Sequence, residues 1–185
     1  MIRPRQFFDR AVTPGDQAPG LTFAVVVAAV YAVGWMAVDP GAIPAIADPP
    51  LLSALVVLLV VVALAAPVGL HLTAAVATVA LVIASLERRD GDGLRGRIGF
   101  RDRGGVSETV QVVAYASAPM ALAGPPVPTL RIACAAYATG LLLVGIRSVH
   151  GTTPIRTLLA AIPPALVGYG VGYRAVAAAR SVLGG

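Results

Sequence analysis

The chain contains no lysine, a single cysteine and few charged residues, and each shortage excludes a class of site. A Walker A loop requires lysine to reach the phosphates, so this motif is excluded. Cys134 alone can form neither an internal disulfide nor a cysteine metal cluster. Only 12% of the 185 residues are charged, whereas soluble domains contain about a quarter. The composition predicts an integral membrane protein with one domain and an all-α fold.

The chain contains long hydrophobic runs. Hydrophobic residues make up 57% of the chain, and the mean hydropathy is +0.83. Residues 49–86 form 38 consecutive positions without Asp, Glu, Lys or Arg. A run of about eighteen such residues typically spans a membrane, because a helix satisfies its own backbone hydrogen bonds in lipid. The 49–86 run is about twice that length, so the number of times it crosses decides the topology.

The distribution of arginine predicts how many times residues 49–86 cross the membrane. All 14 basic residues are arginine, and the formal net charge is +5. Six of them lie in the polar stretch 87–105, namely Arg88, Arg89, Arg95, Arg97, Arg101 and Arg103. Positive loops stay cytoplasmic, so this stretch and the arginine-bearing N-terminus should share one side, and the long run should cross once. Beside membrane spans, such arginines indicate contact with anionic lipid headgroups rather than with nucleic acid.

Proline, glycine and charge divide the chain into a cytoplasmic or interfacial segment, residues 1–20, and a transmembrane domain, residues 21–185. Five spans are predicted in this domain, at about 21–38, 51–86, 107–123, 129–147 and 154–176. Ser107 is expected to be the N-cap of the third span, with Glu108 in its first turn. Arg131, near the outer end of the fourth, is expected to extend to the headgroups. The protein is thus predicted to be a multi-pass protein of the cell membrane.

Small residues predict where helices pack closely. Gly168 and Gly172 have the GxxxG spacing that lets a second helix approach. His71, Thr78 and Ser85 recur every seven residues, with alanines between them. This stripe is expected to pack inward.

Few residues suggest chemistry. His71, Glu108 and Gln111 are candidate intramembrane polar residues, because an ionisable group in a bilayer often marks a functional site. The alternatives are packing for His71 and a favourable helix-dipole contact for Glu108. His150, beside Arg147, is a candidate contact for a lipid or a protein partner, together with the arginines of the polar stretch. Local capping of a helix end is its alternative.

Neither an enzyme nor a cofactor site is predicted. Ser117 has no histidine at a recognisable spacing, and the two histidines lack the spacing of metal ligands. Residues 91–96 match GxGxxG, but they lack the preceding strand and following helix that a dinucleotide site needs. We therefore predict no catalytic residue, metal or cofactor. The sequence leaves a homo-oligomer open.

Three segments carry a resemblance to a known family. They are residues 4–8 (PRQFF), residues 107–119 (SETVQVVAYASAP) and residues 137–151 (YATGLLLVGIRSVHG). With them the chain resembles the Yip domain family of small five-span membrane proteins, in its prokaryotic branch. The resemblance implies a cytoplasmic N-terminus, and eukaryotic relatives bind Rab-type GTPases. We expect a membrane scaffold or docking protein; the alternative is a small transporter or channel that uses His71, Glu108 and Gln111.

Overall fold

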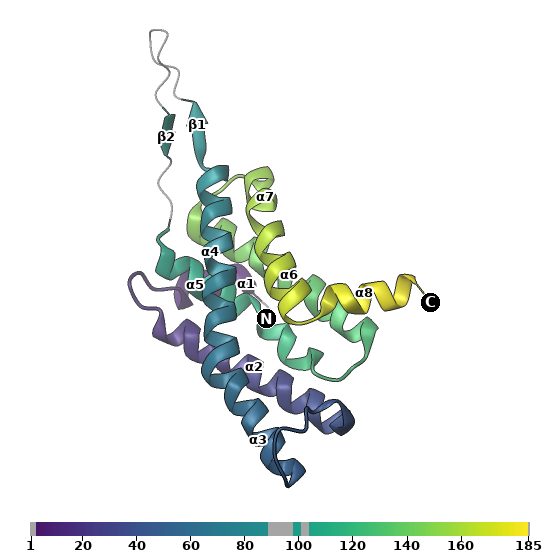
Figure 1. Ribbon diagram of the computed structural model, residues 1–185. Coiled ribbons are helices and arrows are strands. Elements are labelled where there is room, and N and C mark those ends of the chain that lie inside the picture. Colours follow the sequence, from purple (N-terminus) through teal and green to yellow (C-terminus); the bar gives the residue numbers. More distant parts are fainter. Residues whose placement is uncertain (1–2, 89–97, 101–103, 185) are drawn as a thin grey trace.

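The computed structural model describes residues 3–88, 98–100 and 104–184, and it is a helix bundle (Figure 1). The predicted all-α fold is confirmed, with two short strands as the exception within the described residues. The α-helices are α1 (Pro4–Ala11), α2 (Ala18–Val38), α3 (Pro50–Val60), α4 (Ala66–Ala84), α5 (Val106–Ala116), α6 (Pro128–His150), α7 (Pro154–Ala165) and α8 (Ala175–Leu183). Two short 3-10 helices are η1 (Pro40–Ala42) and η3 (Ala118–Ala123), and two π-helical segments are η2 (Val61–Ala65) and η4 (Leu166–Gly172).

The long hydrophobic run folds as one helical rod, in which α3, η2 and α4 follow each other without a break from Pro50 to Ala84. Pro67 has no N–H, and its ring would collide with the carbonyl of Ala63 in a regular α-helix. Ala63 lies in the π-helical turn η2, which widens the rod just before the proline. Leu51, Leu59 and Ile83 are each more than 60% exposed along this rod. Such exposure is compatible with lipid as the surrounding solvent.

Four helices are long and apolar enough to cross a membrane, judged by length and composition over the described residues. They are Ala18–Val38, Pro50–Ala84, Pro128–His150 and Pro154–Gly172. The segment expected as the third span, residues 107–123, is divided between α5 and η3. The count of five spans and the side of the N-terminus remain predictions.

Helix α5 is the centre of the bundle. Every residue from Thr109 to Ser117 is buried, and α5 packs against α2, α4 and α6. Glycines on α2 allow the close approach: a Cβ at Gly20 would lie 3.1 Å from the Cα of Gln111, and one at Gly34 would lie 3.6 Å from the Cα of Gly124. The chain of α5 and η3 therefore lies alongside α2 over most of its length.

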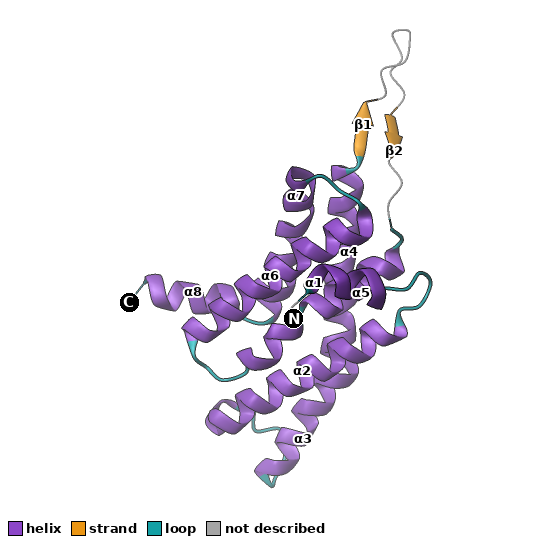
Figure 2. Ribbon diagram, turned by 180° about the vertical axis from the view of Figure 1, so that it is seen from behind, coloured by secondary structure: helices purple, strands orange, loops and turns teal. Residues whose placement is uncertain are grey.

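The N-terminal helix α1 packs onto the bundle, as the view from behind shows (Figure 2). Its Phe8 side chain is fully buried. The space for this ring exists because Gly145 of α6 has no side chain: a Cβ there would lie 3.0 Å from the Phe8 ring and 2.8 Å from Val112. Arg3, just before α1, and Arg5 and Arg10 of α1 remain exposed.

The predicted inward stripe on α4 is wrong for His71, which is exposed. The buried residues of this helix are instead Leu70, Thr73, Ala74, Ala77 and Leu81. An α-helix has about 3.6 residues per turn, so residues seven apart drift by roughly 20° per repeat and do not keep one face. Ser85 is buried and Thr78 is half-buried, whereas His71 has turned outward.

Beyond α4 the chain forms an antiparallel pair of strands, β1 (Leu86–Arg88) and β2 (Ile98–Phe100), with Leu86 opposite Phe100. The pair projects from the end of the bundle where α4 ends and α7 begins (Figure 1). At the C-terminal end of the described chain, α8 packs against α6 and extends to the side (Figure 1).

Candidate functional site

Gln111 holds the connection between α1 and α2. Its side chain is completely buried. The Thr13 N–H donates to the Gln111 side-chain oxygen at 3.0 Å, and the Gln111 amide nitrogen donates to the Thr13 carbonyl at 2.6 Å. Both ends of the amide are therefore used in a structural clamp, as expected for a buried polar group.

Next to this clamp, the first turn of α5 binds the same connection. The Gly15 N–H donates to the Ser107 hydroxyl at 2.9 Å, and that hydroxyl donates to Glu108 at 2.7 Å. The expectation that Ser107 is the N-cap is wrong, because α5 begins at Val106 and its N-cap is Gly105. Glu108 does lie in the first helical turn, where the positive end of the helix dipole stabilises its negative charge.

His150 joins the end of α6 to the start of α5. The ring is buried, and its Nε2 lies 3.3 Å from the Thr109 hydroxyl. Gly104 packs so closely that a Cβ there would lie 3.2 Å from the histidine ring. Gly151 then ends α6 with a left-handed backbone, φ +57°, which favours glycine. Arg147, one turn earlier, is exposed.

His71 faces away from this cluster. It is exposed on α4, and its Nδ1 lies 2.8 Å from the Pro67 carbonyl of its own helix. Gln111 is enclosed and Glu108 half-buried, so the structure does not bring the three polar candidates to one path. Within the described residues, no group of three His, Cys, Asp or Glu could hold a metal ion.

Four of the arginines that the structure describes are exposed at this end of the bundle, and together they are called the basic surface. They are Arg3, just before α1, Arg5 and Arg10 of α1, and Arg147 of α6. Asp9 of α1 accepts a hydrogen bond from Ser148 of α6, which ties the two helices together. Arg88 lies in β1. The other candidates of the polar stretch, Arg89, Arg95, Arg97, Arg101 and Arg103, lie outside the described residues, as does the GxGxxG match at 91–96.

Arg131 does not extend to the headgroups as the sequence suggested. Its side chain is only 8% exposed. Its Nε donates to the Ala123 carbonyl at 3.0 Å, and its second terminal nitrogen donates to the Gly124 carbonyl at 2.8 Å. The guanidinium also lies 5.8 Å from the centre of the Tyr31 ring. Arg131 therefore satisfies carbonyls at the end of η3 and packs on an aromatic face.

The two glycines of the GxxxG pattern have different surroundings. A Cβ at Gly168 would lie 2.9 Å from the Thr73 side chain of α4, so no larger residue fits without a shift. Gly172 is the last residue of η4 and is exposed, and its nearest neighbour, the Val167 carbonyl, belongs to the same segment. Close approach to α4 thus depends on Gly168.

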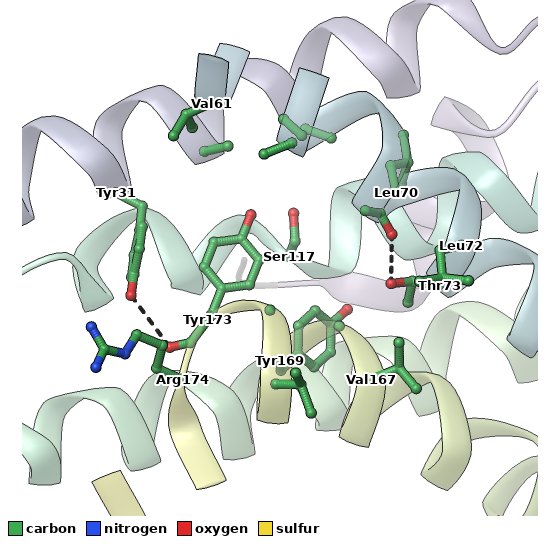
Figure 3. A pocket seen from close by; sticks show the side chains of 18 of the residues that line it. Tyr31, Val61, Leu70, Leu72, Thr73, Ser117, Val167, Tyr169, Tyr173 and Arg174 are labelled. Atoms are coloured by element: carbon green, nitrogen blue, oxygen red, sulfur yellow. Dashed lines mark hydrogen bonds between the residues drawn. The ribbon is translucent and has the colours of Figure 1, made fainter. Parts of the chain in front are cut away.

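A cavity of about 400 Å³ lies between α2, the rod from Pro50 to Ala84, and η4 (Figure 3). Its walls are mostly apolar, with small residues on the two long helices. On α2 these are Ala24, Ala28 and Ala32, and on the rod they are Ala65, Ala66 and Gly69. Small side chains on facing helices create this space, which falls within the usual size of ligand pockets.

Polar groups gather along one side of the cavity. The Tyr31 hydroxyl donates to the Tyr173 carbonyl at 3.5 Å, and the two rings meet edge to face at 5.1 Å. The Tyr173 hydroxyl lies beside Ser117, the residue between α5 and η3 (Figure 3). Arg174 lies at the Tyr31 end, and Thr73 and Val167 lie at the other end (Figure 3). Sequence reasoning missed this cavity because its residues come from segments far apart in the chain, with no shared spacing.

A comparison with protein families identifies the chain over nearly its whole length. Residues 1–174 match the Yip1 domain, so the family prediction is confirmed. The searches of curated proteins and of solved structures gave no significant match. The matched region includes α1, the central helix α5 and every helix that lines the cavity. Together with four helices that are long and apolar enough to cross a bilayer, this match makes the chain a membrane protein of the Yip1 domain family.

Proposed function

We propose that the protein is a non-enzymatic membrane scaffold that docks a protein partner on its cytoplasmic face. The observation that carries this proposal is the basic surface formed by Arg3, Arg5, Arg10 and Arg147. The positive charge of exposed arginines attracts an acidic partner and steers its approach. Arginine also binds carboxylates through two parallel hydrogen bonds, which gives a docking surface specificity.

A fixed arrangement of the helices beneath the arginines supports docking. Phe8 anchors α1 in the groove at Gly145, Gln111 clamps the chain at Thr13, and Thr109 meets His150. These contacts join α1, α5 and α6 through residues distant in sequence. A surface that is already ordered loses little conformational entropy when a partner binds.

The arrangement of α5 and η3 supports five crossings. Gln111, in the middle of α5, lies beside Gly20 near the start of α2, and Gly124, just after η3, lies beside Gly34 near the end of α2. From their residue counts, α5 and η3 extend over about 28 Å, close to the roughly 30 Å hydrocarbon core. A third crossing by this buried central pair would put the end of α6 on the same side as α1. The basic surface would then face the cytoplasm as one patch.

The transporter alternative receives less support from the geometry. The side-chain oxygen and nitrogen of Gln111 are both hydrogen-bonded to Thr13, and His71 faces outward from α4. Solute or ion flux in proteoliposomes that disappears with His71→Ala would nevertheless favour a transporter over a scaffold.

Site-specific photo-cross-linking in intact cells tests the docking proposal. A photoreactive residue at Arg10 or at Arg147 should capture the same protein partner, whereas one at the exposed Arg180 of α8 should not. The combined change Arg5→Glu and Arg10→Glu should abolish capture from position 147, because the surface loses its attraction for an acidic partner. Arg180→Glu is the matched charge reversal and should leave capture unchanged. Equal capture at positions 147 and 180 would contradict docking at this surface.

A further inference from the structure

The cavity of about 400 Å³ lies among helices that are suited to a membrane. Three of the four candidate spans form its walls: α2, the rod from Pro50 to Ala84, and the Pro154–Gly172 helix. In a bilayer these helices would be surrounded by lipid, and the walls of the space between them are mostly apolar. The apolar molecule available there in excess is the acyl chain of a phospholipid.

One end of the cavity has the features of a membrane interface. Trp35 lies in the last turn of α2, and Arg174 follows the end of η4 by two residues. Tryptophan is enriched at the level of the headgroups, and arginine binds phosphate there. Arg174 is the one charged residue among the described residues that line the cavity. The charge thus lies where a headgroup would be when its chain enters the cavity.

The backbone at Arg174 is unusual. Its φ is +61°, and it is the one residue other than glycine with a positive φ in the part of the chain that the structure describes. This left-handed conformation is unfavourable for residues other than glycine and is retained where the surroundings require it. Here it makes the turn between η4 and α8 at the cavity mouth.

Tyr31 gives this mouth a fixed wall. Buried Arg131 lies against its ring, and its hydroxyl donates to the Tyr173 carbonyl. The guanidinium of Arg131 is engaged with the carbonyls of Ala123 and Gly124, whereas Arg174 is exposed. The two arginines near the mouth therefore differ in role. Arg131 holds the wall of the mouth in place, and Arg174 exposes its positive charge.

From these observations we propose that the cavity binds one acyl chain of an anionic phospholipid, with the lipid phosphate at Arg174. The apolar walls accept the chain, and the guanidinium pairs with the phosphate. This lipid site is separate from the basic docking surface and is independent of the proposed function.

Two helix glycines give a matched test of the chain-binding part. Gly69 lines the cavity and Gly140 of α6 does not, and an added Cβ meets nothing within 4 Å at either position. Gly69→Phe should fill the cavity, whereas Gly140→Phe should place the same ring on an outer face. Each variant is purified from membranes containing phosphatidylglycerol and phosphatidylcholine, and retained lipids are measured by native mass spectrometry. The wild type and Gly140→Phe should retain phosphatidylglycerol, and Gly69→Phe should lose it.

Arginine variants test the headgroup part. Arg174→Gln should lower phosphatidylglycerol retention by about tenfold, because it removes one charge-assisted contact, and Arg180→Gln on exposed α8 should not. Melting temperatures near that of the wild type verify folding of each variant. Equal retention by Gly69→Phe and the wild type would overturn the proposal, as would a wild type that holds phosphatidylcholine equally well. A dimer that light scattering detects in the wild type and not in Gly69→Phe would also overturn it, since a second copy would then fill the cavity.

Discussion

Single residues contribute to the packing of this bundle in two ways. Some leave space that a neighbouring helix fills, and others donate hydrogen bonds to backbone carbonyls at helix ends. Arg131 illustrates the second role, since its nitrogens bind the Ala123 and Gly124 carbonyls at the end of η3. These carbonyls lie at the end of a 3-10 helix that is followed by a proline-rich turn, so no further helix turn is present to satisfy them. Gly168 illustrates the first role, because Thr73 of α4 occupies the position of its missing side chain.

At the residue scale, the two glycines of the GxxxG pattern should respond differently to enlargement. Gly168→Ile should lower the free energy of unfolding by about 1–3 kcal/mol, because the new side chain overlaps Thr73. Gly172→Ile should change it by about 0.5 kcal/mol or less, because position 172 is exposed. Thermal unfolding in detergent measures both. Equal destabilisation would show that the contact at Thr73 does not decide this packing.

Helices in this bundle pack closely where one of them has a glycine, because a side chain or the backbone of its neighbour fills the space. Helix α1 has one buried residue, Phe8, and its ring lies where Gly145 leaves room on α6. Helix α5 is enclosed by α2, α4 and α6, and it approaches α2 at Gly20. Because α5 is short and buried on all sides, packing rather than its own length stabilises it.

At the element scale, Phe8→Ala should detach α1 from the bundle. The large-to-small change removes about 3–5 kcal/mol of packing from a helix of eight residues with no other buried side chain. Hydrogen exchange of the α1 amides should accelerate strongly, whereas exchange in α6 should change little. Gln6→Ala, at an exposed position of α1, is the control. Slow exchange in Phe8→Ala would mean that other contacts hold the helix.

The molecule as a whole has one polar end and one cavity end. The contacts of Gln111, Glu108 and His150 lie where α1, the start of α5 and the end of α6 meet. At the cavity end, Trp35 lies near the end of α2, Arg131 near the start of α6, and Arg174 between η4 and α8. Under the proposed topology the first end faces the cytoplasm, so docking and lipid binding would occur on opposite sides of the membrane.

At the scale of the molecule, cysteine labelling from outside intact cells tests this topology. With Cys134→Ala as background, Ala42→Cys should react with a membrane-impermeant maleimide, since η1 follows the first crossing. Arg10→Cys and Arg147→Cys should react only after the cells are permeabilised. Labelling of Arg147→Cys from outside would instead indicate four crossings, with α5 and η3 entering and leaving on one side.

The sequence by itself determined that the chain is helical, that lipid is its solvent, and which family it belongs to. The first two conclusions depend on composition and on the lengths of hydrophobic runs, which are properties of single segments. The family follows from the resemblance carried by residues 4–8, 107–119 and 137–151. Residues 50–84 form one continuous helical rod, and the single crossing expected from the distribution of arginine stays a prediction.

The roles of individual polar residues were decided only by the tertiary structure. His71 faces outward, Arg131 faces inward, and Gln111 closes a clamp with Thr13, and none of these follows from local spacing. In lipid both faces of a helix are apolar, so the hydrophobic pattern does not reveal which face is buried. Close contacts at glycines such as Gly145 and Gly168 select that face, and they arise only when helices distant in the chain meet.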